Sequence, residues 1–204
     1  KAKVQFELED MGKKDETTKA RLDEGIVTLK AHPVPLYLIG GRTVMPFGVF
    51  EDHLIEGTLT EDLYEIDEVG AILRYAPDFY GLDISFSVYE DASIMKNLED
   101  FDTHESRADR HEEGSFKSYI VNVTLEPVED TLRLSTFYNN EPGDQRRNTS
   151  MGGALTLNVW KFILDAEYIA ALQREDGENG QENKERAAVA GFAFDVLDSL
   201  QLAA

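Results

Sequence analysis

The segment Phe79–Asp91, FYGLDISFSVYED, alternates between apolar residues and polar or small residues over most of its length. Successive side chains of an extended chain point to opposite faces, so such a segment forms a β-strand with one apolar face and one polar face. One parity carries Tyr80, Leu82, Ile84, Phe86 and Val88, and the other carries Gly81, Asp83, Ser85 and Ser87. What each of these two faces contacts decides the class of fold.

The same period of two recurs along the chain and predicts about ten strands, many of them near the roughly 9–11 residues that cross a bilayer at a tilt. The C-terminal DSLQLAA is typical of a turn that leads into another strand, and neither end has a recognisable start or finish, so we expect one domain over 1–204 that is part of a longer chain. The expected strands are Lys1–Asp10, Gly25–Ala31, Leu36–Met45, Glu68–Tyr75, Phe79–Glu90, Phe116–Leu125, Thr131–Asn139, Thr149–Trp160, Phe162–Gln173 and Ala187–Val196.

The connections between these strands alternate between short and long. HPVP, APD, EPVED, the bend at Trp160–Lys161 and LDSL are short, whereas the connections between them are longer and mostly acidic. All the tight turns then lie at one end of the strands. This arrangement is typical of bacterial outer-membrane barrels, with short periplasmic turns and long external loops. The sequence therefore predicts an all-β, antiparallel, up-and-down transmembrane β-barrel.

The two faces of the strands have different neighbours under this interpretation. The apolar parity faces lipid, and charges near the strand centres fall almost entirely on the other parity. A bilayer enforces this sorting, because Arg or Lys on the lipid face near the midplane costs about 2–4 kcal/mol. The mixed charges of the interior suit a water-filled channel, a polar-solute site or a salt-bridge network that fills a narrow barrel. The predicted pore-lining residues are Lys3, Glu7, Lys30, Arg74, Asp83, Ser85, Asn122, Arg133, Asn158, Asp165 and Glu167.

Aromatic residues near the strand ends fit the interfacial girdles of such barrels, although they also flank strands in other β proteins. They are Tyr75, Tyr80, Tyr119, Tyr138, Trp160 and Phe162. Arg42 breaks the pattern because it shares its parity with Leu36 and Leu38. We expect the GGR sequence there to form a β-bulge that switches faces.

The net charge of −20 argues against nucleic acid as a partner, because the field of the protein repels a polyanion. The chain has no cysteine, which excludes disulfides and thiolate metal sites, and it has no apolar run that matches a membrane helix. We expect outer-membrane lipid and a small polar solute or metal chelate as partners, and no cofactor. The oligomeric state stays open.

The loop over 91–115 is the candidate for capture or gating of a solute. It contains His104 and His111 among several carboxylates, which are weak candidates for an iron or other transition-metal site, while the carboxylates alone suit calcium. The alternative is a solvated acidic loop, because no EF-hand pattern is present. Nucleophile elbows, zinc-protease motifs and phosphate loops are also missing, so we expect no enzyme.

The stretch GGRTVMPFGVFEDHLIEGTLTEDLYEIDEVGAIL, with DEGIVTLKAHPVPLYLIG before it, resembles a segment of the outer-membrane porin family that includes the legiobactin-type siderophore porins, and more distantly the phosphate-selective porins. The match is concentrated in residues 24–73. The resemblance implies a barrel of about sixteen strands that carries ferric siderophores or other small polar solutes. The matching positions are Gly41, Arg42, Pro46, Phe47, Gly48, Phe50, Leu59 and Thr60.

Two functions follow as hypotheses. The first is a porin of the bacterial outer membrane for passive uptake of small polar solutes or ferric-siderophore-like chelates, selected by the charges of the lumen. The second is a soluble all-β binding or structural protein with acidic, calcium-binding loops. The two differ in whether the apolar parity lies on the outside of the sheet or is buried against itself.

Overall fold

The computed structural model describes residues 2–9, 19–49, 58–100, 116–143, 146–176, 182, 184–197 and 200–203. Within these, it gives only the helix or strand assignment for 2–9, 19–24, 99–100, 195–197 and 200–203. Neither helix in this part of the chain has the length and the apolar character that crossing a membrane requires.

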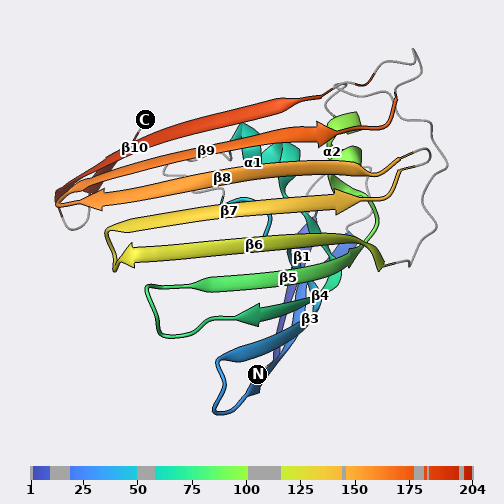
Figure 1. The fold of residues 1–204 in the computed structure, drawn as a ribbon, viewed down its shortest axis with the longest axis horizontal. Helices are drawn as coiled ribbons and strands as arrows, with labels where there is room; N and C mark the ends of the chain where they lie inside the picture. Colours follow the sequence, from blue (N-terminus) through green and yellow to red (C-terminus); the bar gives the residue numbers. More distant parts are fainter. Residues whose placement is uncertain are drawn as a thin grey trace.

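One antiparallel sheet of eleven strands makes up most of the molecule, and each strand pairs with its neighbours in the sequence (Figure 1). The predicted all-β, up-and-down fold is confirmed. β1 and β11 are the two edges, and the described residues give no pairing between them. The strands are β1 (Ala2–Glu9), β2 (Lys19–Ala31), β3 (Leu36–Val44), β4 (Asp67–Tyr75), β5 (Asp83–Glu90), β6 (Phe116–Val128), β7 (Leu132–Glu141), β8 (Asn148–Val159), β9 (Phe162–Gln173), β10 (Arg186–Leu197) and β11 (Leu200–Ala203).

The predicted alternation of the connections is confirmed only in part, because the connection over 76–82, predicted as the short turn APD, is longer than the connection over 142–147 at the opposite end. The turns over 32–35, 129–131 and 160–161 lie at one end of the sheet, on the left in Figure 1, together with the somewhat longer connection over 76–82. The connections over 45–66, 91–115, 142–147 and 174–185 leave from the opposite end. We call these the turn end and the loop end.

Two local predictions are wrong. Phe79–Leu82 is not part of β5 but forms a turn, because Tyr80 and Gly81 have φ values of 48° and 54°, which a strand does not allow. The GGR sequence forms no bulge, since β3 pairs with β2 and β4 without a shift of register. Gly41 has a φ of 136°, and a Cβ atom there would lie 1.9 Å from the carbonyl oxygen of Gly25. Only glycine fits this close approach of β3 to β2.

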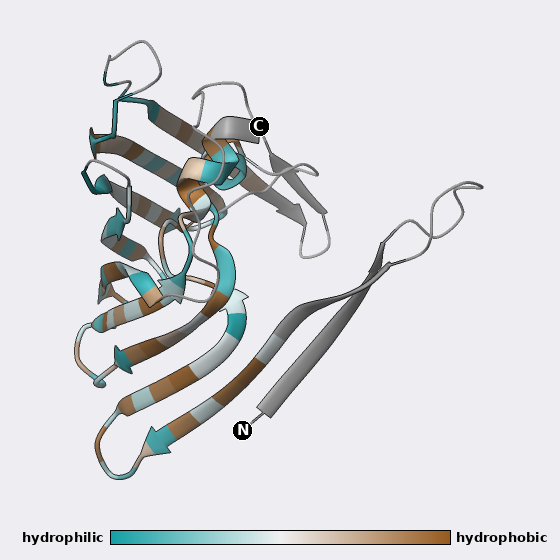
Figure 2. Ribbon diagram, turned by 90° about the vertical axis from the view of Figure 1, so that its right-hand side faces the viewer, coloured by the Kyte–Doolittle hydropathy of each residue, from teal (hydrophilic) through white to brown (hydrophobic). Residues whose placement is uncertain are grey.

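The apolar parity lies on the exposed, outer face of the sheet. Leu29 is 61% exposed, Phe86 47% and Ile84 38%, whereas the intervening Ser85 and Ser87 of β5 are buried. Figure 2 shows the resulting alternation of brown and teal along the strands. This sorting is inverted relative to a soluble sheet, whose apolar parity is covered. The prediction that the apolar parity faces outward is confirmed for the strands whose side chains are described.

The concave face of the sheet is covered by two helices and by part of the connection between β3 and β4. The helices are α1 (Leu59–Tyr64) and α2 (Ser93–Asp100), which the sequence analysis did not predict. α1 begins with a capping box in which the side chains of Thr58 and Glu61 bond each other's backbone N–H groups. Together these elements form the hydrophobic core with inward residues of the sheet, mainly Met45, Phe47, Leu63, Tyr64, Ile66, Ile72, Tyr89, Ile94, Met95, Leu98, Ile120, Phe137 and Ile169.

Candidate functional site on the concave face

The connection between β3 and β4 folds inward over the polar face of the sheet, and we call its described parts, 45–49 and 58–66, the inner segment. Two hydrogen bonds fix its first part. The backbone N–H of Val49 donates to Glu167 Oε1 on β9 at 2.7 Å, and Asn122 Nδ2 on β6 donates to the carbonyl oxygen of Pro46 at 3.1 Å. Polar groups of the sheet thus satisfy backbone groups that the inward fold would otherwise bury unpaired.

An aromatic contact anchors the same part of the inner segment. Phe47 is fully buried, and its ring meets that of Phe137 on β7 edge-on, with 5.1 Å between the centroids. The centroid of the Tyr64 ring lies 6.2 Å from that of the Phe47 ring. Phe137 lies across Gly152 of β8, where a Cβ atom would come within 2.2 Å of the ring. The glycine provides the space that lets Phe137 receive Phe47.

An open cavity of about 290 Å³ lies between the inner segment and strands β3 to β7. Its wall is mixed, with aliphatic side chains from β3, β4 and the inner segment on one side and hydroxyl, amide and charged groups of the sheet on the other. It is lined by Ile39, Val44, Pro46, Gly48, Val49, Ile72, Arg74, Asp83, Ser85, Asn122, Thr124, Arg133 and Ser135.

The charges of this cavity come from two arginines and one carboxylate. Arg74 Nε donates to Asp83 Oδ2 at 2.6 Å, and a second nitrogen of the guanidinium forms an ion pair with the same oxygen. Arg133 enters the wall from β7. The hydroxyl oxygens of Thr124 and Ser135, which also line the cavity, lie 2.9 Å apart. The cavity therefore has a small excess of positive charge and a row of neutral hydrogen-bonding groups.

Two carboxylates of β9 lie on the other side of the inner segment. Asp165 and Glu167 are 8% and 6% exposed, and with Val49, Thr156 and Gly191 they line a narrow recess. The concave face thus carries arginines on β4 and β7 and carboxylates on β9, with the inner segment between them. Fixed charges of opposite sign along a polar passage select solutes by charge and orientation.

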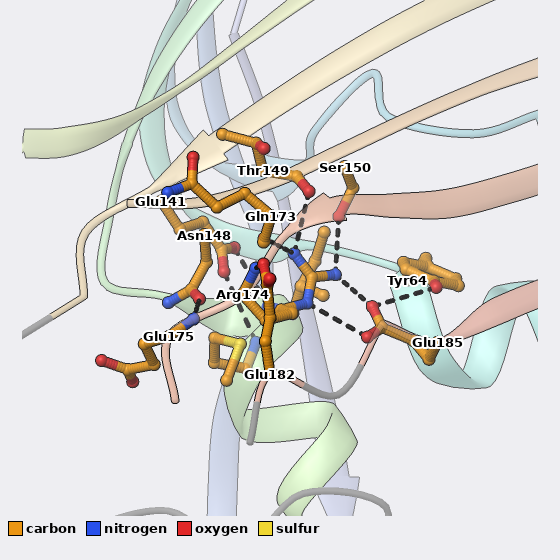
Figure 3. Close-up of polar contacts among 12 residues, drawn as sticks. Tyr64, Glu141, Asn148, Thr149, Ser150, Gln173, Arg174, Glu175, Glu182 and Glu185 are labelled. Carbon is orange, nitrogen blue, oxygen red and sulfur yellow. Dashed lines mark hydrogen bonds and ion pairs between the residues drawn. The ribbon is translucent and has the colours of Figure 1, made fainter. Parts of the chain in front are cut away.

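Figure 3 shows a second polar cluster, at the loop end, around the buried side chain of Arg174. Its guanidinium donates to the carbonyl oxygen of Thr149 at 3.1 Å and to Ser150 Oγ at 2.8 Å, and it forms a bidentate ion pair with Glu185. The hydroxyl of Tyr64 in α1 donates to the same carboxylate at 3.2 Å. Burial, and then the negative charge of Glu185, raise the pKa of Tyr64. The cluster thus ties α1 to the connection between β9 and β10.

Glu182 makes further contacts within the connection between β9 and β10. Its carboxylate accepts the backbone N–H of Arg174 at 2.9 Å, and it lies 3.3 Å from Lys184 Nζ and 3.8 Å from Arg146 Nη1. The hydrogen bond from Arg174 is the main reason why the pKa of Glu182 is lowered, and the two cations act in the same direction. Arg146 also forms an ion pair with Asp176.

Glu141, the last residue of β7, fixes the start of α2. Its buried carboxylate accepts the backbone N–H groups of Ile94 at 3.0 Å and Met95 at 3.4 Å, together with the hydroxyl of Tyr89 at 2.8 Å. A negative charge at the first turn of a helix satisfies free N–H groups and complements the helix dipole. The strand thereby holds α2 against the loop end of the concave face.

The predicted pore-lining residues fall into several groups. Arg74, Asp83, Ser85, Asn122 and Arg133 line the larger cavity, and Asp165 and Glu167 line the recess beside it. Lys30 is exposed, with its ammonium 5.0 Å from the ring of Tyr37, and Asn158 bonds a turn carbonyl at the turn end, so neither lines the larger cavity or the recess. The side chains of Lys3 and Glu7, and all of His104 and His111, lie outside the described residues.

The described part of the chain holds no group of His, Cys, Asp or Glu that is arranged to bind a metal ion. The sequence analysis missed the inner segment, Arg174 and Glu141. One signal was available for the first: Ile120, Phe137 and Ile169 are apolar residues on the otherwise polar parity. They are the positions that the inner segment and the helices cover.

Comparison of the chain with protein-family models, with curated proteins and with solved structures finds no match.

Proposed function

We propose that this protein is an outer-membrane channel for passive uptake of small polar solutes. The observation that carries the proposal is the inverted polarity of the sheet, with an exposed apolar outer face and a polar concave face. In water, so much exposed apolar surface on neighbouring strands would be costly, at roughly 25 cal/mol per Å². Lipid around the outer face and water within the concave face remove that cost.

The height of the apolar band supports the same proposal. Nine residue steps separate Met151, near the loop end of β8, from Trp160 in the turn that follows. At about 3.3 Å per residue and a strand tilt of about 40°, they span roughly 23 Å along the membrane normal. This matches the roughly 25 Å apolar band of outer-membrane barrels. Trp160, 83% exposed, and Phe162 flank the band at the turn end, where an aromatic girdle belongs.

In this proposal the inner segment narrows the passage, and the cavity beside it is where a solute is selected. A volume of about 290 Å³ suits a small polar molecule. A ferric-siderophore-like chelate is larger, so its passage requires the inner segment to move. A passage that is closed around its whole circumference also requires the two edge strands, β1 and β11, to pair with each other or with further strands.

Conductance in planar bilayers tests the channel and its charges together. The protein should be monodisperse only in detergent and should form conducting pores. Arg74→Gln and Arg133→Gln should each raise the preference for cations, because each removes a positive charge from the cavity. Arg186→Gln is the matched control, since Arg186 is exposed at the start of β10 and lies outside the cavity. Unchanged selectivity in both cavity variants would remove these arginines from the passage.

The packed core on the concave face favours a second candidate, a soluble all-β binding protein. This core needs no membrane, since it joins the inner segment and both helices to the sheet. Its cavity would then bind a ligand from solution. A protein that is monodisperse in buffer without detergent, and that does not conduct, would establish this candidate and exclude the channel.

A further inference from the structure

Arg147 differs from other arginines of this acidic chain in the groups it contacts. It donates through Nε to Asn140 Oδ1, and through Nη2 to the carbonyl oxygens of Lys117 at 2.5 Å and Asn140 at 3.2 Å. All of these acceptors are neutral, and within the described residues Nη1 donates no hydrogen bond. Carboxylates neutralise other arginines, namely Arg42, Arg74, Arg146 and Arg174.

This arginine lies on the outer face at the loop end, above a cluster of aromatic side chains. Its guanidinium carbon is 5.8 Å from the ring centroid of Tyr119, which lies 6.2 Å from both Tyr138 and Phe86. Lys117, also exposed, shares the parity of Tyr119 on β6. Val121, level with Phe86 and Tyr138 in the register of the strands, is the first exposed aliphatic side chain of β6, and Leu125 follows it toward the turn end. From the loop end downward, the surface therefore passes from cations to aromatics to aliphatics.

That order matches the order of groups in a lipid leaflet. Aromatic side chains take the depth of the interface, and cations just beyond them lie at the depth of the headgroups. Longer loops of such barrels face the outside, so the loop end meets the outer leaflet, whose glycolipid carries phosphates. A guanidinium with free N–H groups binds phosphate in a bidentate manner. Glu90 shares this rim at the end of β5, and no ion pair joins it to Arg147 among the described residues.

We propose that Arg147, with Lys117 beside it, binds a phosphate group of the outer-leaflet glycolipid, an inference that rests on the proposed membrane location. Because the net charge of the protein is −20, its field repels an anionic lipid surface. The site provides a local attraction at one place on the rim. It orders one lipid molecule against Tyr119 and holds the connection between β7 and β8 at the headgroup level.

Binding of lipid A to the purified protein in detergent micelles tests the proposal. Lipid A with its phosphate groups should bind at least about tenfold more tightly than the dephosphorylated form, as expected for charge-assisted hydrogen bonds. Arg147→Gln should remove that difference, and Arg147→Lys should retain part of it. Lys161→Gln is the matched control, because Lys161 also lies over an aromatic ring, 6.0 Å from the centroid of Trp160, but at the turn end.

Comparison of the two forms of lipid A on the unaltered protein does not depend on whether a variant folds. Equal binding of the two forms would overturn the lipid-phosphate site while leaving the channel proposal intact. Inorganic phosphate that binds as tightly as lipid A would also overturn it, since the site would then be an ion site. A protein that needs no detergent and binds neither lipid form would refute the membrane location itself.

Discussion

Truncation of Phe47 to alanine should release the inner segment from the concave face. The side chain is fully buried, and it is the inner segment's aromatic contact with the sheet, through Phe137. Removal of a buried phenylalanine ring costs about 3–5 kcal/mol, and loss of the aromatic pair is part of that cost. Each 1.4 kcal/mol changes an equilibrium constant about tenfold, so the ratio of detached to docked segment should rise by roughly two to three and a half orders of magnitude.

A thiol reporter measures this change directly, because the chain contains no cysteine. Val49→Cys places one thiol on the inner segment, next to the hydrogen bond from the backbone of that residue to Glu167. Its rate of labelling by a soluble maleimide should rise steeply in the Phe47→Ala background. Single-channel conductance should rise in parallel, since detachment widens the proposed passage.

Phe86→Ala is the matched control for this experiment. Phe86 is a phenylalanine of β5 that is 47% exposed on the outer face of the sheet, where it stacks on Tyr119 and does not contact the inner segment. Its truncation should leave both the labelling rate and the conductance unchanged. If Phe47→Ala behaves like Phe86→Ala in both measurements, Phe47 does not hold the inner segment and the reasoning is refuted.

Three further changes have defined outcomes. Gly152→Val should push Phe137 aside and speed labelling of the thiol reporter, whereas Gly153→Ala, where a Cβ atom stays 3.3 Å from its nearest neighbour, should not. Arg174→Met should lower the free energy of unfolding in detergent by about 3–5 kcal/mol, because it leaves a partly buried carboxylate unpaired; a loss below about 1 kcal/mol would contradict the buried ion pair. The pKa of the Glu182 carboxyl is lowered in the folded protein. The charged carboxylate therefore stabilises the fold fully above the ordinary carboxyl pKa, and this stabilisation is lost as the pH falls through the lowered pKa. The protection of the Arg174 amide against hydrogen exchange, relative to the intrinsic rate at each pH, should therefore fall in acid, and Glu182→Gln should abolish that pH dependence of the protection.

The strands were predictable from the sequence because two different environments act on alternate residues. At Ile84 and Ser85, for example, the exposed and the buried side chain differ in polarity as the pattern requires. The pattern misled where the alternation of polarity continued but the strand did not, at Tyr80 and Gly81, whose positive φ values end the strand. Arg42 led to the wrong prediction of a β-bulge. It keeps the register of β3 with β4, and its guanidinium forms an ion pair with Asp67 at 2.9 Å.

The helices were readable in principle. Thr58 and Glu61 have the spacing of a capping box, and Ile94 and Leu98 are four residues apart, as one apolar face of a helix requires. The acidic residues around both segments favour solvated loops instead. The cluster around Arg174 was not readable, since Ser150, which accepts from Arg174, and Tyr64, which donates to Glu185, come from elements far apart in the sequence. Only the fold brings them together.

The hydrogen bond between Val49 and Glu167 joins residues 118 positions apart, whereas every strand of the sheet pairs only with its neighbours in the sequence. Hairpins between neighbouring strands close early and cheaply, because they fix only short loops, but the contacts of the inner segment with Phe137 and Glu167 cannot form until β7 and β9 are in place. We therefore expect the sheet to form first and the inner segment to dock on its concave face as one of the last steps. A mutation that slows the formation of β9 should then delay docking of the inner segment without altering the strands that precede it.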